Sequence, residues 1–291
     1  MVAAVRRFNR TVTQRVGALN DRFLARDRPL AAARLLWEIG LDGCEVRALR
    51  TRLDLDSGHA SRLLRSLESD GLVTVRAGPA DGRVRTAYLT EAGRAERALI
   101  DERSDDLARS LLAPLNRRQQ DRLVTAMQDV ERLLTAASVT IQSVDPAHPD
   151  ARAGIRAYVA ELDRRFPEGF DPRTGVPAEP HELRPPTGEF LVAFLHSEPV
   201  GCGGVRHHRN EGWSEIKRVW VAESVRGLGL GRRLLGELER RASAAGAGAV
   251  RLDTHSSLTE AATLYRSAGY REIAAYNDNP YAHHWFEKNL L

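Results

Sequence analysis

The stretch RGLGLG, Arg226–Gly231, combines residue types that can bind a phosphate group. Glycine lets backbone N–H groups approach an anion without interference from a Cβ atom. The residues that follow, RRLLGELERRA, have helical periodicity, and the free N–H groups and positive dipole end of a helix N-terminus also favour an anion. Arg226 and Arg232 can add charge-assisted hydrogen bonds. We therefore predict a phosphate site between the apolar segment VWV, 219–221, and this helix.

The spacing of these glycines excludes two familiar phosphate-binding sequences. A dinucleotide fingerprint, GxGxxG, needs a third glycine at its sixth position, which is missing whether counting starts at Gly227 or at Gly229. A P-loop needs Gly-Lys followed by Ser or Thr, and the chain's two lysines follow Ile216 and Glu287. What remains is R-x-x-G-x-G, placed after a strand and before an amphipathic helix.

This hexad resembles motif A of the GNAT family of N-acetyltransferases, and LDTHSSLTEAATLYRSAGY, Leu252–Tyr270, resembles motif B of that family. The resemblance covers about residues 139–291. It implies an α/β acyl-CoA N-acyltransferase fold with a mixed sheet, which binds the pyrophosphate of acetyl-CoA, its co-substrate, at the hexad. The family often has asparagine where this chain has His255. The residues placed at the cofactor are Val219, Val221, Arg226, Gly227, Leu228, Gly229, Gly231, Arg232 and His255.

The implied reaction is the transfer of acetyl from a thioester to an amine. The amine must lose a proton, because the pKa of a free alkylammonium is about 10, and the thiolate leaving group, with a pKa of about 8.5, should receive one. By resemblance, Tyr265 in LYRSAGY is the general acid and the backbone N–H of Val221 polarises the thioester carbonyl. The alternative for Tyr265 is a tyrosine packed in an apolar stripe with Leu264.

Glu215, in WSEIKRVWV, is the candidate general base. Regular strand alternation would place Glu215, Lys217, Val219 and Val221 on one face. A carboxylate there could take a proton from the amine, directly or through water. The alternative is a salt bridge with Lys217, Arg218 or another arginine.

The acceptor pocket is predicted from aromatic and amide side chains: Tyr158, Phe166, Phe170 and Asn277. The two phenylalanines belong to a long loop rich in proline and glycine, 166–188, and long loops are often functional. We expect no metal, because neighbouring residues such as His283 and His284 point to opposite faces of a strand and no cysteine or carboxylate cluster joins them.

The first half of the chain has a different pattern. Periodicity predicts helices over 2–22, 30–38, 45–52, 57–69, 91–112 and 116–137, with a β-hairpin around GPADGR. Asp56 or Ser57 can cap the fourth helix, and Gly71 can end it. This order is that of a winged helix-turn-helix, in which the fourth helix enters the major groove of DNA.

ASRLLRSLESDGLV and DGRVRTAYLTEAGR resemble the recognition helix and wing of the MarR family of transcriptional regulators. The resemblance covers about residues 1–137. It implies a homodimer, built from the first and last helices, that binds double-stranded DNA at a pseudo-palindromic operator. The alternative is that the arginines form only a solvated face. The candidate DNA contacts are Ser57, His59, Ser61, Arg62, Arg65, Arg83 and Arg85.

Length and composition are compatible with this arrangement. The chain has 291 residues, a net charge of +4 and a pI of about 9.4, which suits a polyanionic partner. No apolar run approaches the roughly 18 residues of a membrane span. Because the start, MVAAVRRFNR, is charged where a signal peptide would be apolar, we expect a cytoplasmic protein without membrane association.

The combined hypothesis is a two-domain protein. Residues 1–137 form a mainly-α, MarR-like winged helix-turn-helix domain for DNA binding and dimerisation, and residues 138–291 form an α/β GNAT-like acetyltransferase domain. The leading function is acetyl-CoA-dependent acetylation of a primary amine on a small molecule, with amino acids and their derivatives as candidates. Two alternatives stay open: a regulator whose second domain senses acetyl-CoA or an amine, and a protein lysine acetyltransferase.

Overall fold

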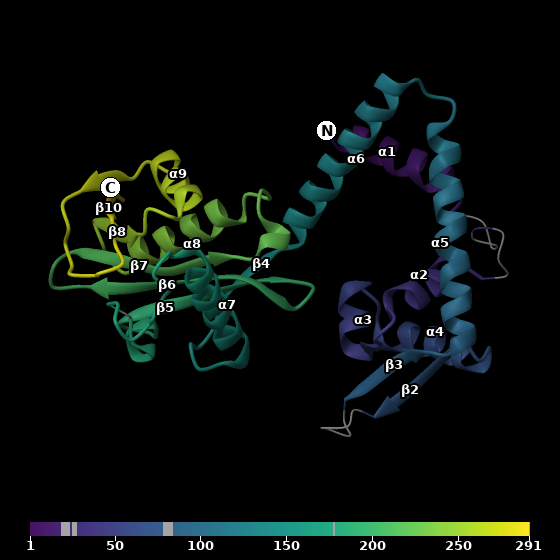
Figure 1. Ribbon diagram of the computed structural model, residues 1–291, viewed down its shortest axis with the longest axis horizontal. Helices are drawn as coiled ribbons and strands as arrows, with labels where there is room; N and C mark the ends of the chain where they lie inside the picture. The colour runs from purple at the N-terminus through teal and green to yellow at the C-terminus, as the bar shows by residue number, and fades with distance from the viewer. Residues whose placement is uncertain (19–23, 25–27, 78–83, 177, 291) are drawn as a thin grey trace. The chain divides into compact units, whose positions relative to one another are not determined.

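A computed structural model describes the chain except for residues 19–23, 25–27, 78–83, 177 and 291 (Figure 1). The chain divides into two compact units, Met1–Met127 and Gln128–Leu291. The division falls inside α6, Arg117–Ser138, so the boundary at 137 and 138 remains a prediction. None of the described helices combines the length and the apolar character that a membrane span requires.

The first unit is a winged helix-turn-helix, as predicted. After α4 the hairpin strands β2 and β3 pair from Val73 opposite Leu89 to Ala77 opposite Arg85. A two-residue strand that the sequence did not predict, β1, pairs with β3. The elements are α1 (Val2–Arg15), α2 (Leu30–Glu38), β1 (Cys44–Glu45), α3 (Val46–Arg52), α4 (Ser57–Ser69), β2 (Val73–Ala77), β3 (Arg85–Leu89) and α5 (Glu91–Leu112).

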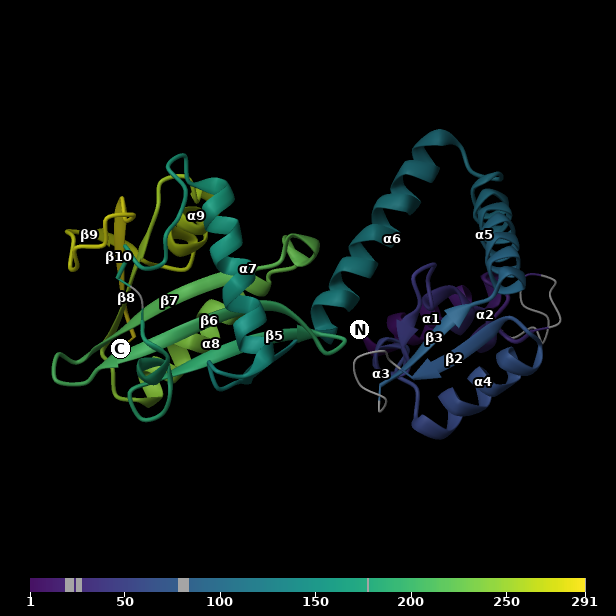
Figure 2. The same ribbon diagram turned by 60° about the horizontal axis from the view of Figure 1, so that its bottom comes forward.

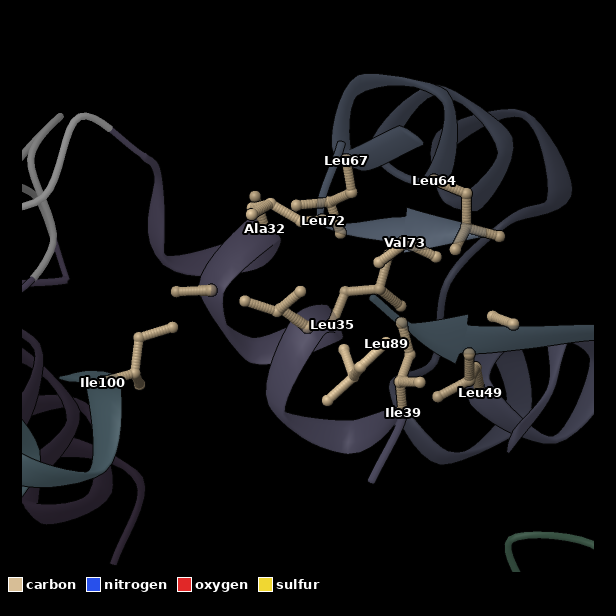
Figure 3. Close-up of a cluster of buried hydrophobic side chains, with 13 residues drawn as sticks. Ala32, Leu35, Ile39, Leu49, Leu64, Leu67, Leu72, Val73, Leu89 and Ile100 are labelled. Carbon is tan, nitrogen blue, oxygen red and sulfur yellow. The ribbon is translucent and has the colours of Figure 1, made fainter. Parts of the chain in front are cut away.

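Helix α4 has the local signals that the sequence predicted. The side chain of Asp56 accepts a hydrogen bond from the His59 N–H at 2.9 Å, which caps the start of the helix. Gly71, with a φ of 71°, follows its end. Leu64 and Leu67 anchor one face in the core of this unit (Figure 3). The opposite face of α4 is therefore free to meet a partner.

Helix α1 differs from its prediction. It ends at Arg15 rather than at residue 22, because Gly17, with a φ of 68°, breaks the helix. No residue of α1 is buried. Its apolar side chains at helical spacing, Val5, Phe8 and Val12, are 58, 48 and 39% exposed, so one apolar stripe has no cover within the described residues.

The second unit is built on a seven-stranded mixed sheet with strand order β4-β5-β6-β7-β8-β10-β9. The pair β7–β8 is parallel and the other neighbours are antiparallel. The elements are β4 (Thr140–Ser143), α7 (Pro149–Arg165), the 3₁₀ helix η2 (Pro180–Leu183), β5 (Gly188–Leu195), β6 (Glu198–His208), β7 (Trp213–Val221), the 3₁₀ helix η3 (Glu223–Val225), α8 (Leu230–Ala244), β8 (Ala249–Thr254), α9 (Thr259–Ser267), β9 (Arg271–Ile273) and β10 (His284–Asn289).

Helices α7 and α8 cover opposite faces of this sheet, and α7 crosses β5, β6 and β7 (Figure 2). Two consecutive residues of β6 show the two faces. A Cβ atom at Gly154 of α7 would lie 3.2 Å from the Cβ atom of Cys202, while a Cβ atom at Gly203 would lie 2.8 Å from a methyl group of Leu238 in α8. The helix that carries the acceptor candidate Tyr158 and the helix behind the glycine-rich turn are thus separated by the sheet.

The middle strand of the sheet, β7, contains a β-bulge. The pairing of β6 with β7 shifts between Cys202–Trp220 and Gly204–Lys217, and Arg218 has a φ of 56°. The predicted alternation is therefore wrong. Glu215 and Lys217 lie on the α7 face, whereas Val219 packs with the cluster that includes α8. The extra residue moves the later side chains to the other face.

Strands β7 and β8 pair only at their beginning, from Trp213 opposite Ala249 to Glu215 opposite Arg251. Beyond that point their backbones no longer form a ladder. Instead the ammonium of Lys217 meets the carboxylate of Asp253 at 2.8 Å. The ion pair between Lys217 and Asp253 thus connects β7 and β8 beyond the part where their backbones pair.

Candidate active site

The glycine-rich turn leaves β7 and opens α8 with its backbone amides free of protein acceptors. Gly227 and Gly229 both have a φ of 75°, a left-handed conformation that favours glycine. Gly229 is the N-cap of α8, and no side chain caps the helix. Within the described residues, the N–H groups from Gly227 to Arg232 have no backbone acceptor. This is the arrangement that binds a phosphate at a helix start.

A groove of about 540 Å³ runs from this turn. Its lining brings together seven of the nine predicted cofactor residues and both candidate tyrosines: Val219, Val221, Arg226, Gly227, Gly229, Gly231, Arg232, Tyr158 and Tyr265. Of the predicted nine, Leu228 and His255 are not part of the lining. Leu228 instead packs its side chain against the core next to Val225 and Leu230.

His255 is held away from the groove by three contacts. Its ring stacks on Phe166 with centroids 4.0 Å apart. Its Nδ1 accepts a hydrogen bond from the Ser257 N–H at 3.0 Å, and its Nε2 lies 3.4 Å from Glu168. The side chain is 4% exposed. A cofactor contact by this histidine was predicted from the resemblance, and the structure does not bring the ring to the groove.

Four charged groups surround the turn, two of which the sequence did not reveal. Arg226 is paired with Glu161 of α7, which also accepts from the indole of Trp220 at 2.9 Å. Arg132, on α6, donates to the carbonyl of Gly227 at 3.0 Å. Arg232 donates to the Ser267 hydroxyl at 2.6 Å. Glu161 and Arg132 are 65 and 95 residues from their partners, so no local pattern could indicate them.

Tyr265 lies in the wall of the groove and is 6% exposed. Burial, and secondly the charge of Asp253, raise its pKa, so the phenol stays protonated at neutral pH. The ring packs near Tyr270 and Phe286, but within the described residues its hydroxyl has no hydrogen-bond partner. The hydroxyl is therefore a free donor in the groove, while the ring is packed as the alternative interpretation proposed.

Glu215 is buried in a polar network and lines neither the groove nor the cavity beside it. The carboxylate is 1% exposed and contacts Arg206, Lys217 at 2.8 Å and the Tyr276 hydroxyl at 3.0 Å. Burial alone would raise its pKa, but the His208 ring and the charges of Lys217 and Arg206 outweigh burial and lower it. A carboxylate so fully bonded is a weak base, so these surroundings do not favour the predicted role, which stays a prediction.

A second, smaller cavity of about 210 Å³ adjoins the first. Tyr158 lines both, so the two share this residue in their walls. Phe170 is also in the wall, together with Lys217, Arg218, Asp253 and Asn279. Phe166 and Asn277 are not in the wall: Asn277 bonds Asp253 at 2.8 Å and Phe166 stacks on His255. Two of the four predicted acceptor residues thus meet here.

The predicted DNA contacts belong to α4 and to the hairpin of the first unit. Ser57, Ser61, Arg62 and Arg65 are exposed on α4, opposite the buried Leu64. His59 is partly exposed, and Arg85 is exposed at the start of β3. The wing residue Arg83 lies outside the described residues.

Two family models match the chain. The acetyltransferase (GNAT) family model matches residues 156–270, which contain the turn and Tyr265. The MarR family model matches residues 27–84, which contain α2, α3, α4 and β2.

Similar proteins carry acetyltransferase names. The IAA acetyltransferase of Azospirillum brasilense is 33% identical over 114 residues, covering 39% of this chain and 74% of that protein. An uncharacterized N-acetyltransferase of Bacillus subtilis, YjcF, is 31% identical over 129 residues, covering 41% and 88%. The N-acetylaspartate synthetase of Homo sapiens is 26% identical over 203 residues, covering 68% of this chain and 66% of that protein.

Proposed function

This chain belongs to the acetyltransferase (GNAT) family and carries a MarR family domain, and from this premise we propose that it acetylates the primary amine of a small molecule with acetyl-CoA. In this reaction the amine nitrogen bonds to the acetyl carbon, the carbon–sulfur bond breaks, and the proton lost by the amine ends on the released thiol. The name of the human relative, N-acetylaspartate synthetase, adds amino acids to the candidate acceptors.

The observation that carries the proposal is the run of backbone N–H groups, from Gly227 to Arg232, without backbone acceptors at the start of α8. These donors fit a pyrophosphate, and Arg226 and Arg232 add positive charge beside them. The groove that starts there continues to Tyr158 and Tyr265, which gives room for an extended arm. Acetyl-CoA, when bound, supplies the activated thioester.

We assign Tyr265 to the leaving group. A phenol whose pKa is raised above about 10 is a weaker acid than a thiol of pKa about 8.5, so it stabilises the departing thiolate mainly by donating a hydrogen bond. The Val221 N–H, at the groove wall, is the proposed donor to the thioester carbonyl. Glu215 has no part in this scheme.

A second function, a sensor of acetyl-CoA, is favoured by one contact. Arg132 belongs to α6, the helix in which the first unit ends and the second begins, and it bonds the cofactor turn at Gly227. Occupation of the turn would thus act directly on that helix. The cavity of about 210 Å³ favours a small acceptor over the lysine of a protein or peptide.

We further propose that residues 1–137 bind duplex DNA as a homodimer in the cytoplasm. The exposed arginines Arg62 and Arg65 on α4 suit the phosphates and base edges of a major groove. The apolar stripe on α1, Val5, Phe8 and Val12, suits the interface between two copies.

The test of the main function combines turnover with a matched pair of variants. The purified chain should release thiol from acetyl-CoA in the presence of a panel of small primary amines. Gly229→Ala should weaken acetyl-CoA binding, because alanine costs about 1–2 kcal/mol at a φ of 75° and the turn would relax.

Gly246→Ala is the control for backbone strain. Gly246 has a φ of 89° and, like Gly229, has no atom within 4 Å of a built Cβ, but it lies after the end of α8. Both variants should lose similar stability, and only Gly229→Ala should lose affinity. Equal acetyl-CoA affinities of the two variants would contradict the phosphate assignment.

A further inference from the structure

The β-bulge in β7 brings two consecutive cationic side chains to the same face of the sheet. Neighbours on a regular strand point to opposite faces. Here the Lys217 ammonium reaches Asp253 at 2.8 Å, and the Arg218 guanidinium donates to the carbonyl of Ala178 at 2.9 Å. Both line the cavity of about 210 Å³. Arg218 has a φ of 56°, which is strained for a residue other than glycine, and such strain clusters at functional sites.

Arg218 lines the cavity next to the groove. The two share Tyr158 in their walls, and the groove contains Tyr265. Phe170 and Pro172 also form part of the wall, so the half-buried guanidinium shares its cavity with apolar side chains.

Among the described residues, carboxylates compensate the charge of Lys217 but not that of Arg218. Lys217 lies 2.8 Å from both Glu215 and Asp253. Asp253 in turn accepts from Asn277 at 2.8 Å and from Asn279 at 2.9 Å, which occupies its oxygens.

Arg218 forms no ion pair in the part of the chain that the structure describes, and its one side-chain hydrogen bond there is to a backbone carbonyl. A guanidinium with unused donors in a half-buried cavity is suited to a carboxylate, which it can bind with two parallel hydrogen bonds.

We propose that Arg218 binds a carboxylate of the acceptor, so that the preferred substrates are amino acids and other primary amines that carry a carboxylate. This inference rests on the proposed acetyltransferase function and adds the substrate class and the residue that selects it. The rest of the wall, Tyr158 and Phe170, then surrounds the carbon skeleton between the carboxylate and the amine.

The test compares amino acids with their own primary amides on the full chain. L-methionine and L-phenylalanine, each with its α-carboxamide, are assayed by thiol release from acetyl-CoA. The amide removes the α-carboxylate and keeps the skeleton. It also has a less basic amine, so more of it is deprotonated, and this bias works against the proposal. We expect kcat/KM to be about 10- to 100-fold higher for the acids that are accepted.

The variant Arg218→Asn should lower kcat/KM for the acids, through KM, far more than it lowers kcat/KM for the amides. Asparagine tolerates a positive φ, so the bulge is retained. Arg209→Asn is the control, because Arg209 also donates to a single backbone carbonyl, that of Pro186, but lies outside both cavities. Equal losses for acids and amides in Arg218→Asn, or a wild-type preference for the amides, would overturn the proposal.

The carboxylate site can also be tested if the chain proves to have no acetyltransferase activity. If no amine releases thiol, calorimetric titration of the same acids and amides into the chain still decides the binding claim. Tighter binding of the acids to the wild type than to Arg218→Asn supports the carboxylate site. No difference between the two proteins refutes it.

Discussion

At the level of single residues, the two predicted catalytic groups have opposite surroundings. The Tyr265 hydroxyl faces the groove without a partner among the described residues, whereas Glu215 is bonded from several sides. The sequence could indicate both positions, because each is tied to a motif or a strand. It could not indicate the partners of Glu215, since Arg206 and Tyr276 come from a neighbouring strand and a distant loop.

Replacement of Tyr265 by phenylalanine should lower kcat by about 10²-fold, because one hydrogen-bond donor to the leaving group is lost. Affinity for acetyl-CoA, measured by calorimetry, should change little. Tyr270→Phe removes another buried hydroxyl, from the same cluster but outside the groove, and should leave kcat near the wild-type value. An unchanged kcat in Tyr265→Phe would rule out the assigned role.

The network around Glu215 predicts a pH-dependent stability. Its pKa is lowered in the folded chain, so its contribution is fully present above its ordinary value of 4.5 and is lost as the pH falls further. Glu215→Gln should lower the free energy of unfolding by about 3 kcal/mol at neutral pH, because Lys217 and Arg206 lose a buried partner.

This difference from the wild type should shrink as the pH falls from about 5 to about 3. Urea unfolding at several pH values measures it. Glu223→Gln, at an exposed position, should show neither the loss nor its pH dependence. A loss for Glu215→Gln that is constant with pH would mean that the charge of Glu215 does not stabilise the fold.

At the level of elements, local signals were reliable and the bulge was not foreseen. The caps of α4 and the helix behind the glycine-rich turn follow from short sequence patterns. The alternation in β7 failed because its bulge depends on the register with β6, a property of two strands together. That failure concealed Arg218, which a regular strand would have turned away from Lys217.

Helix α4 carries its own prediction. Arg65→Ala should weaken binding to duplex DNA and reduce the slope of log affinity against log salt by about 1, because one phosphate or base-edge contact is lost. Fluorescence anisotropy with a labelled duplex at several salt concentrations measures both quantities. Arg118→Ala, at an exposed position on α6, should leave the slope unchanged. If the two variants behave alike, the exposed face of α4 is only a solvated surface.

At the level of the whole molecule, the order of two domain types was predictable because each carries its own motifs. The limits between them were harder to place, since α6 is a single continuous helix that belongs to both units. The sequence indicates where a helix ends, but it does not indicate which turns of that helix pack with each unit. A change of composition near residue 139 therefore marks the end of the helix and not the division at Met127.

The hydrogen bond from Arg132 to the Gly227 carbonyl affects where the chain can be divided into two fragments. A cut at residue 137 would leave both family-model matches intact, but it would remove Arg132 from the phosphate-binding turn. Arg233, which donates to the carbonyls of Ala136 and Val139, would lose one of its anchors by the same cut. A fragment that starts at residue 138 should bind acetyl-CoA several-fold more weakly than one that starts at residue 128, and Arg132→Gln in the longer fragment should reproduce most of that deficit in calorimetry. Equal affinities of the two fragments would show that Arg132 is not needed for acetyl-CoA binding.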